Sequence, residues 1–233
     1  MKLAVIPARG GSKRVPKKNI KTFCGKPLIS YSISTALESG VFDKVIVSTD
    51  CDQIADIATE YGADVPFMRP EQLSNDHAGT WAVMSHAVTQ MSQLGFNADA
   101  VCCIYATAPF LMPEFLRYGL DELLANPNKG YAFSVTSFSF PVLRGLYIND
   151  GDVSPMFPEN MGKRSQDLPE CYHDAGQFYW GRPESFIQSK PLFPGNSTPI
   201  ILPRHLVQDI DTPEDWERAE LMYKAYVANL RNG

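Results

Sequence analysis

A dense group of cations lies near the start of the chain, in the stretch ARGGSKRVPKKN. Five basic residues fall within ten positions, namely Arg9, Lys13, Arg14, Lys17 and Lys18. We expect Gly10 and Gly11 to expose main-chain N–H groups in conformations that a side chain would forbid. Cations and exposed N–H groups together suit a polyphosphate ligand, although a solvated basic loop would have the same composition. The glycine spacing matches neither GxxxxGK[ST] nor GxGxxG, which argues against a P-loop or a dinucleotide-binding loop.

Two carboxylates near the other end of the chain have the spacing of a metal-binding pair. Asp209 and Asp211 are two residues apart at the end of an apolar stretch, in QDIDTPED. In an extended segment both side chains would lie on one face, with Cα atoms roughly 6–7 Å apart. Mg²⁺ usually takes one or two carboxylates together with substrate phosphates. The alternative is structural, because Asp211 before Thr212 and Pro213 is also typical of a helix start.

Alternating strand and helix patterns place both groups in one α/β domain spanning residues 1–233. Apolar runs predict strands at 3–7, 44–48, 65–68, 100–105, 131–136, 173–179 and 200–210. Helical periodicity predicts helices at 27–40, 52–61, 79–94, 113–123 and 213–223. Such alternation implies a mainly parallel sheet, in which ligands bind outside the carboxyl ends of the strands. The basic loop follows the first strand and therefore lies at such an end.

Residues 139–170 interrupt the alternation. They contain four prolines and lack helical periodicity, which indicates an inserted arm. Irregular segments of this length are usually functional or pack on a partner, and the alternative is a long surface loop.

Composition excludes several classes of protein. The formal charge is −5, so the basic loop is a local exception and no nucleic acid partner is expected. No run approaches eighteen apolar residues, which predicts a cytoplasmic protein without a membrane partner. The five cysteines show no CxxC spacing and are expected to be reduced structural thiols.

Four stretches, AVIPARGGSKRVPKKNI, VIVSTD, RPEQLSNDHAGT and QDIDTPEDW, occur in this order. They resemble the cytidylyltransferases that activate sialic-acid-type sugars, and the resemblance covers nearly the whole chain. It implies a Rossmann-like nucleotidyltransferase fold, with a mainly parallel sheet flanked by helices and a dimerisation arm. It also implies a reaction in which CTP and a nonulosonic acid give a CMP-sugar and pyrophosphate, with Mg²⁺ as cofactor and a homodimer as the assembly.

The resemblance assigns roles residue by residue. The matching positions imply that CTP is bound by Ala8, Arg9, Gly10, Gly11, Ser12, Lys13, Lys18, Asn19, Arg69, Ala78 and Thr80. Asp209 and Asp211 match the metal ligands. While the sugar's anomeric hydroxyl attacks the α-phosphate in line, Arg9 and Lys13 would stabilise charge on the leaving pyrophosphate. Mg²⁺ held by Asp209 and Asp211 would polarise the α-phosphate.

Two departures from the sialic-acid pattern concern the sugar. YATAPFL replaces a QPTSPLR run, so that Tyr105 stands in place of an amide, and YHDAGQFYWG replaces a PNGAIY-like strand. This version resembles the branch of the family that handles pseudaminic acid. The residues expected at the sugar are Tyr105, His173, Gln177 and, from the arm of a neighbouring subunit, Arg164. His173 is a candidate general base, although a lone histidine on a strand more often has a packing role.

Other functions stay open at this point. One alternative is a cytidylyltransferase of the same kind whose sugar is N-acetylneuraminic or legionaminic acid. Another is a nucleotidyltransferase that acts on a sugar phosphate. From a different class, a non-catalytic CTP-binding regulatory module would keep the loop without turnover. A polyanion-binding protein is disfavoured by the acidic charge.

Overall fold

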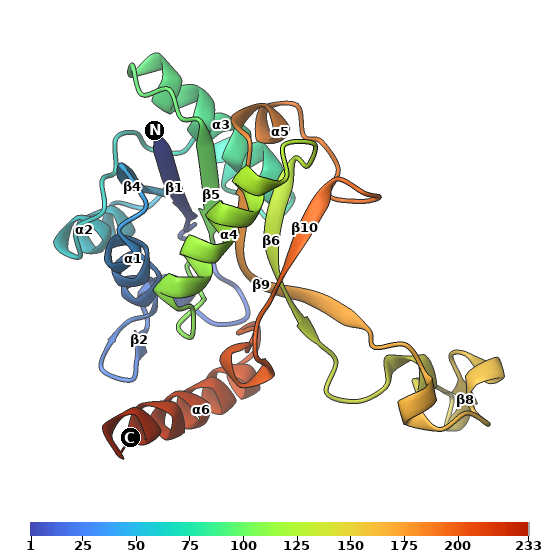
Figure 1. Cartoon of the computed structure of the whole chain (residues 1–233). Helices are drawn as coiled ribbons and strands as arrows, with labels where there is room; N and C mark the ends of the chain where they lie inside the picture. Colours follow the sequence, from blue (N-terminus) through green and yellow to red (C-terminus); the bar gives the residue numbers. More distant parts are fainter. Residues whose placement is uncertain (233) are drawn as a thin grey trace.

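The computed structural model describes residues 1–232, and a six-stranded sheet forms its centre (Figure 1). The order of the strands is β10–β6–β9–β5–β1–β4. Their bounds are β1 Lys2–Pro7, β4 Lys44–Ser48, β5 Ala100–Ile104, β6 Tyr131–Ser137, β9 Tyr172–Gly181 and β10 Ser197–Ile201. Strand β9 is antiparallel to both β5 and β6, and the other neighbours are parallel. The prediction of a mainly parallel sheet is therefore confirmed.

Helices cover both faces of the sheet. They are α1 Leu28–Ser39, α2 Asp52–Glu60, α3 Thr80–Gln93, α4 Pro113–Ala125, α5 Pro183–Ile187 and α6 Pro213–Asn232. Apolar side chains of α1, α2 and α4 pack on one face, and those of α3 and α5 pack on the other. Strand β1 alternates between the two cores, with Ala4 and Ile6 in the first and Leu3 and Val5 in the second. This burial on both faces explains its unbroken apolar run.

Shorter elements connect the main ones. A two-stranded ribbon of β2 (Thr22–Phe23) and β3 (Lys26–Pro27) precedes α1. Turns of 3₁₀ helix occur at Lys18–Ile20, Glu71–Leu73, Val142–Arg144, Pro158–Asn160, Ser165–Asp167 and Arg204–Leu206. Within residues 1–232 no helix is both long and apolar enough to cross a membrane. All five cysteines are free, as predicted.

Two predicted strands are wrong, and proline explains both. Around residues 65–68 only isolated bridges form, from Asp64 to Ile46 of β4 and from Met68 to Thr49 just after it, because Pro66 has no N–H to donate to a ladder. The predicted strand at 200–210 ends at Ile201, since Pro203 and a 3₁₀ turn follow it. Asp209 and Asp211 consequently lie in an irregular segment before α6, and the strand geometry expected for them does not apply.

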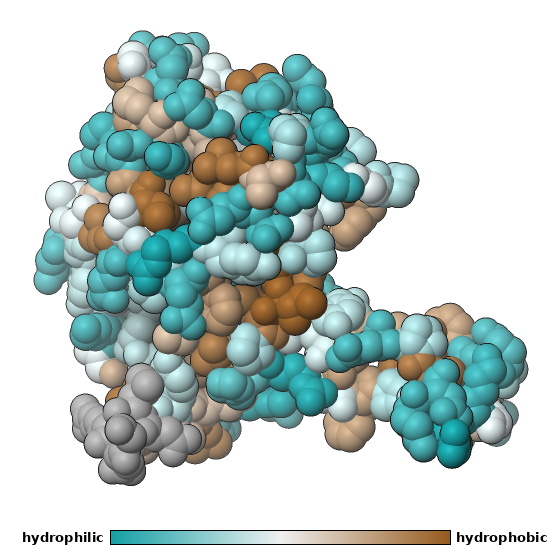
Figure 2. Space-filling view, viewed as in Figure 1, coloured by the Kyte–Doolittle hydropathy of each residue, from teal (hydrophilic) through white to brown (hydrophobic). Residues whose placement is uncertain are grey.

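The arm leaves the sheet between β6 and β9, and Figures 1 and 2 show it projecting from the rest of the molecule. It carries an antiparallel hairpin of β7 (Leu146–Asn149) and β8 (Asp152–Pro155). Its base is held where Ser137 pairs with Tyr172. Large apolar side chains are exposed on the arm, including Phe140 at 84% and Ile148 at 75%. Such exposure is typical of an interaction surface, so its role in dimerisation stays a prediction.

The close approach of α4 to the sheet at Gly119 generates a prediction about stability. A Cβ atom on Gly119 of α4 would lie 2.8 Å from both Phe178 and Trp180, which are fully buried. Alanine normally stabilises a helix by about 1 kcal/mol relative to glycine, but overpacking costs about 1–3 kcal/mol. Trp180 cannot yield easily because its Nε1–H donates to the Leu116 carbonyl oxygen at 2.9 Å. We expect Gly119→Ala to lower Tm by roughly 2–8 °C.

Differential scanning calorimetry checks this expectation. Gly162→Ala is the matched control, because a Cβ atom there meets open space. An unchanged or raised Tm in Gly119→Ala would show that the helix can shift away from the sheet.

Candidate functional site

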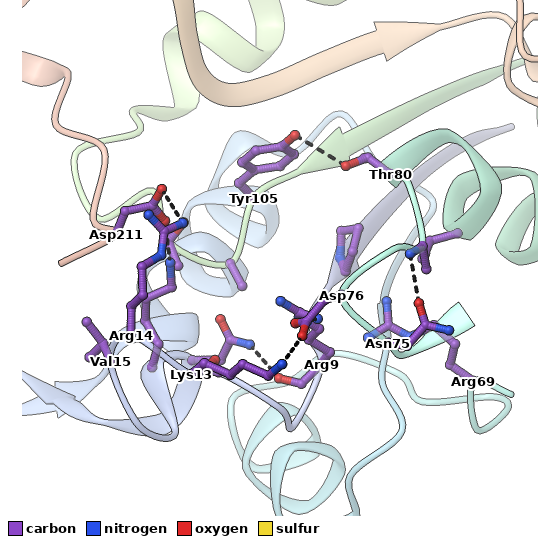
Figure 3. A pocket seen from close by; sticks show the side chains of 18 of the residues that line it. Arg9, Lys13, Arg14, Val15, Arg69, Asn75, Asp76, Thr80, Tyr105 and Asp211 are labelled. Atoms are coloured by element: carbon purple, nitrogen blue, oxygen red, sulfur yellow. Dashed lines mark hydrogen bonds and ion pairs between the residues drawn. The ribbon is translucent and has the colours of Figure 1, made fainter. Parts of the chain in front are cut away.

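A cavity of about 580 Å³ opens at the carboxyl ends of β1 and β5 (Figure 3). From β1 the chain moves to β4 on one side and then crosses to β5 on the other, so the cavity lies at a switch in strand order. Such a switch is the usual ligand site of an open α/β sheet. The predicted residues that line it are Arg9, Ser12, Lys13, Lys18, Asn19, Arg69, Ala78, Thr80, Tyr105 and Asp211.

Four of the five cations of the basic loop are held by carboxylates on two opposite sides of the cavity. On one side Asp76 accepts a hydrogen bond from Arg9 Nη1 at 2.6 Å and pairs with Lys13. On the other side Asp211 pairs with Arg14 at 2.8 Å and with Lys18 Nζ at 3.1 Å, as Figure 3 shows for Arg14. Lys13 and Arg14 are therefore turned apart, toward opposite walls. The loop is thus an ordered part of the cavity wall.

The expected role of the two glycines requires a correction. Neither Gly10 nor Gly11 has a positive φ, so neither adopts a conformation that a side chain would forbid. Gly10 is needed for another reason, because a Cβ atom there would lie 3.1 Å from the Cys51 Cβ. Its N–H also donates to Asp50 Oδ1 at 2.9 Å and is therefore already paired. The left-handed residue of the loop is Lys17, with φ of 52°.

Arg69 is a buried cation with unused hydrogen-bonding capacity. Its side chain is 3% exposed, and its nearest carboxylate oxygen, Asp50 Oδ1, lies 3.6 Å from Nη2. Nε and Nη2 have no hydrogen-bond partner. Burial lowers the pKa of the guanidinium, and the Asp50 carboxylate opposes that shift. A buried donor without a partner is costly, so this wall of the cavity suits a ligand that presents acceptor atoms.

The turn before α3 forms the next part of the wall. Asn75 Oδ1 accepts hydrogen bonds from the main-chain N–H groups of His77 at 2.9 Å and Ala78 at 3.0 Å. This local cap fixes the chain on its way into α3. Thr80 at the start of the helix then points at Tyr105, with 3.4 Å between the two hydroxyl oxygens (Figure 3).

Asp211 lines the cavity, whereas Asp209 is exposed beside it. The pKa of Asp209 is raised, first because protein atoms displace water from its carboxyl group and then because the Asp211 carboxylate repels its charge. A divalent cation bound between two carboxylates removes the repulsion between their charges. Lys18 and Arg14 use one position on each Asp211 oxygen, which leaves further lone pairs for a metal. The donor set therefore fits a hard cation.

Other metal-binding arrangements are absent from the described part of the chain. Among residues 1–232 no group of three or more His, Cys, Asp or Glu side chains is placed to hold a metal. A cation at the aspartate pair would thus need ligands from a substrate or from water.

The structure also tests the helix-start role considered for Asp211. Thr212 Oγ1 accepts a hydrogen bond from the Asp215 N–H at 3.1 Å, and Asp215 accepts one from the Thr212 N–H at 2.8 Å. This is a reciprocal capping box at the start of α6. The structural alternative for Asp211 is therefore wrong, because the cap is one residue further on. The T-x-x-D spacing was readable in the sequence.

Several predicted residues lie outside the cavity lining. Ala8, Gly10 and Gly11 of the basic loop are not among its lining residues. His173 is exposed, with its ring against Phe138 at 4.8 Å between centroids. Gln177 is buried and donates from Nε2 to the Leu206 carbonyl oxygen at 2.5 Å.

Arg164 is exposed on the arm, where it pairs with Asp167 at 2.7 Å. Within the described chain the arm carries it away from the cavity (Figure 1). The sugar-binding roles of Arg164, His173 and Gln177 stay predictions.

Sequence reasoning missed Asp76 and Asn75. Both lie within RPEQLSNDHAGT, one of the four matching stretches, but their partners are found only in the folded chain. The sequence separation between Asp76 and Arg9 is 67 residues, which no local pattern reveals.

Comparisons with known proteins identify the family of this chain. The chain is 45% identical over 223 residues to a pseudaminic acid cytidylyltransferase of Campylobacter jejuni, a match that covers 95% of this chain and 96% of the relative. It is 32% identical over 219 residues to a CMP-N,N'-diacetyllegionaminic acid synthase of Legionella pneumophila, covering 94% of each.

A solved structure shares the fold. It is a CMP:2-keto-3-deoxy-manno-octonic acid synthetase complexed with CTP, with a TM-score of 0.71 at 18% identity, and the match covers 97% of this chain and 99% of that one. Residues 3–143 match the family model described as Cytidylyltransferase, a range that holds most of the cavity wall. The resemblance inferred from four short stretches is therefore confirmed, and this chain belongs to the cytidylyltransferase family.

Proposed function

We propose that this chain joins CTP to pseudaminic acid, giving CMP-pseudaminic acid and pyrophosphate. The observation that carries the nucleotide half is Arg69, a buried guanidinium with unpaired nitrogens in the wall of a basic cavity. The sugar half is supported by the 45% identity to a pseudaminic acid cytidylyltransferase, against 32% to the legionaminic acid enzyme.

The cytosine would lie against Arg69 and the turn before α3. Cytosine has acceptor atoms at O2 and N3 beside an amino donor, and the unpaired Arg69 nitrogens supply the donors for the acceptors. The Ala78 carbonyl, on a turn fixed by Asn75, would accept from the amino group. Because Arg69 has buried donors to satisfy, a base without acceptors at this edge would be rejected.

The triphosphate would replace Asp76 as the partner of the loop cations. Arg9 and Lys13 already converge on one carboxylate, which shows that both reach a common anion. Ser12 and Lys18 also line the cavity. Asn19 is buried and donates to the Arg9 carbonyl oxygen at 3.0 Å, so it holds the loop in place near the ribose.

Asp209 and Asp211 would hold Mg²⁺ between the loop and α6. When bound, the ion would withdraw charge from the α-phosphate. Lys18 fixes this segment by donating to the Ile210 carbonyl oxygen at 2.6 Å, and Arg14 orients the Asp211 carboxylate. Both contacts exist before any ligand enters, so little rearrangement is needed during the reaction.

The chemistry is an in-line attack by the sugar's anomeric hydroxyl on the α-phosphorus. Arg9 and Lys13 would stabilise negative charge on the departing pyrophosphate. Tyr105, which lines the cavity, would orient the sugar acid. Arg164 from the arm of a second copy would pair with the carboxylate of that sugar acid. The proposed active form is therefore a homodimer.

The first experiment offers CTP and Mg²⁺ with pseudaminic, N,N'-diacetyllegionaminic or N-acetylneuraminic acid in separate reactions. We expect CMP-sugar and pyrophosphate from pseudaminic acid, detected by mass spectrometry and a coupled pyrophosphate assay. EDTA should abolish turnover and added Mg²⁺ should restore it. Product only from another acid would refute the assignment of the sugar, and CTP binding without any product would favour a regulatory module.

A second prediction concerns the base pocket. Hydrogen bonds to charged groups contribute about 1.5–3 kcal/mol, so Arg69→Met should weaken CTP binding roughly tenfold to a hundredfold. The same variant should not lower Tm, because it removes a buried charge with incomplete partners. Isothermal titration calorimetry and calorimetric melting measure the two effects. Lys44→Met, which breaks a surface pair with Asp64, is the control. Unchanged CTP affinity in Arg69→Met would place the base elsewhere.

A third prediction concerns the aspartate pair. Loss of one preorganised charge contact costs about 3 kcal/mol of barrier, so Asp211→Asn should reduce kcat about a hundredfold. The Mg²⁺ concentration needed for half-maximal rate should rise, whereas Asp64→Asn on the surface should change neither quantity. Near-normal turnover across a magnesium titration would remove Asp211 from the metal site.

A further inference from the structure

Asp76 occupies a place that a phosphate group would need. Both of its carboxylate oxygens are used by cations of the basic loop, since Oδ1 accepts from Arg9 Nη1 at 2.6 Å and Oδ2 pairs with Lys13 Nζ (Figure 3). Within residues 1–232 this carboxylate makes no other hydrogen bond or ion pair. The anion site formed by Arg9 and Lys13 is therefore filled by a group of the protein itself.

The turn that carries Asp76 keeps its shape without help from that carboxylate. Asn75 Oδ1 accepts hydrogen bonds from the main-chain N–H groups of His77 and Ala78. Asn75 Nδ2 donates to the Gln72 carbonyl oxygen at 3.1 Å. These bonds are all local to the turn. Asp76 can thus leave the two cations while the turn before α3 stays folded.

The three side chains of this contact are accessible to solvent. The exposed fraction is 36% for Arg9, 79% for Lys13 and 36% for Asp76. Hydrogen bonds from Lys13 and then from Arg9 lower the pKa of the Asp76 carboxyl group, so it is ionised near neutral pH. Ion pairs with this exposure are weak. A phosphate group, which brings more charge and more acceptor oxygens, can therefore take the place of the carboxylate.

The ion pairs at Asp211 are built differently. Lys18 is only 18% exposed there, and its Nζ also donates to the Ile210 carbonyl oxygen at 2.6 Å. It therefore stays attached to that segment even if the carboxylate takes a new partner. Among the described residues the side chains of Arg9 and Lys13 have no second polar partner of this kind. The pair of contacts at Asp76 is thus the one that a ligand can exchange.

We propose that Asp76 is an internal competitor for pyrophosphate, which takes Arg9 and Lys13 back from that product and so promotes its release. The inference rests on the proposed function, in which the same two cations stabilise the departing pyrophosphate. Asp76 lowers the affinity of the loop for phosphate groups in two ways. Its ion pairs must break before the cations are free, and its negative charge then repels the bound ligand. It acts only through the two cations and takes no part in bond making.

Isothermal titration calorimetry with pyrophosphate and Mg²⁺ tests the proposal. Asp76→Asn keeps the shape of the side chain and removes its charge. We expect this variant to bind pyrophosphate roughly threefold to thirtyfold more tightly than the wild type, which is the range that two exposed ion pairs predict. Asp64→Asn is the matched control, because it removes one exposed carboxylate that pairs with Lys44. The affinity of this control for pyrophosphate should equal that of the wild type.

Inhibition by the product gives a second measurement. In reactions with CTP and pseudaminic acid, Asp76→Asn should be inhibited by added pyrophosphate at concentrations roughly threefold to thirtyfold lower than the wild type. Asp76→Glu keeps the negative charge and should return the inhibition constant toward the wild-type value. A residue that only supports the fold would not give this pattern of loss and rescue.

Several results would overturn the inference. If Asp76 serves only to hold the loop in place, Asp76→Asn should bind pyrophosphate more weakly, which is the opposite sign. Equal affinity in Asp76→Asn and the wild type would show that phosphate groups do not displace the carboxylate. Tighter binding in Asp64→Asn as well would assign the effect to net charge, and a wild type that binds no pyrophosphate would leave nothing to compete for.

Failure of the proposed function gives a different result. Pyrophosphate binding needs no sugar acid, so the affinities of the wild type and Asp76→Asn can be compared in any case. A wild-type protein that binds pyrophosphate but forms no CMP-pseudaminic acid would refute the proposed sugar, while tighter binding in Asp76→Asn would still support the competitor role.

Discussion

Mutual repulsion among the cations of the loop after β1 is the constraint on which the site depends. Four positive side chains of this loop line one cavity, and they stay in place because Asp76 attracts two of them and Asp211 the other two. These carboxylates come from opposite walls. They separate the cations into two groups and leave a space between them. The shape of the cavity therefore depends on two carboxylates, Asp76 in the turn before α3 and Asp211 in the segment before α6.

Packing at the chain ends fixes that balance in space. Helix α6 places Trp216 edge-on against Phe23 of β2, with centroids 5.5 Å apart, and Tyr223 lies against the same ring. Because Thr212 and Asp215 begin this helix, its docking sets where Asp211 stands. The apolar cluster thus positions the proposed metal ligands against the nucleotide loop. Few side chains of this apolar cluster touch the cavity. The cluster nevertheless sets the distance between the basic loop and the segment that carries Asp211.

The sequence predicts local features well and long-range ones poorly. Helices bounded by Gly40 and Pro113 begin and end close to the expected residues, because caps and proline act within one turn. Strands fail at Pro66 and Pro203, where an apolar run lacks the donors of a ladder. The antiparallel direction of β9 and its register shift against β6 depend on partners at least 35 residues away, and no periodicity in β9 itself encodes them. In the site, the cations and the aspartate pair were identified by residue type, whereas Asp76 became visible only through its contacts with Arg9 and Lys13.

The contact between Arg14 and Asp211 joins residues that are 197 positions apart. During synthesis on the ribosome the basic loop therefore emerges long before the carboxylate that completes it. Until residue 211 has left the exit tunnel, Arg14 and Lys18 have no counter-charge from the last helix segment, and the proposed metal ligands do not yet exist. A chain that ended before residue 211 would lack the carboxylate that pairs with Arg14 and Lys18. The basic loop can therefore reach its final arrangement only after nearly the whole chain has been made.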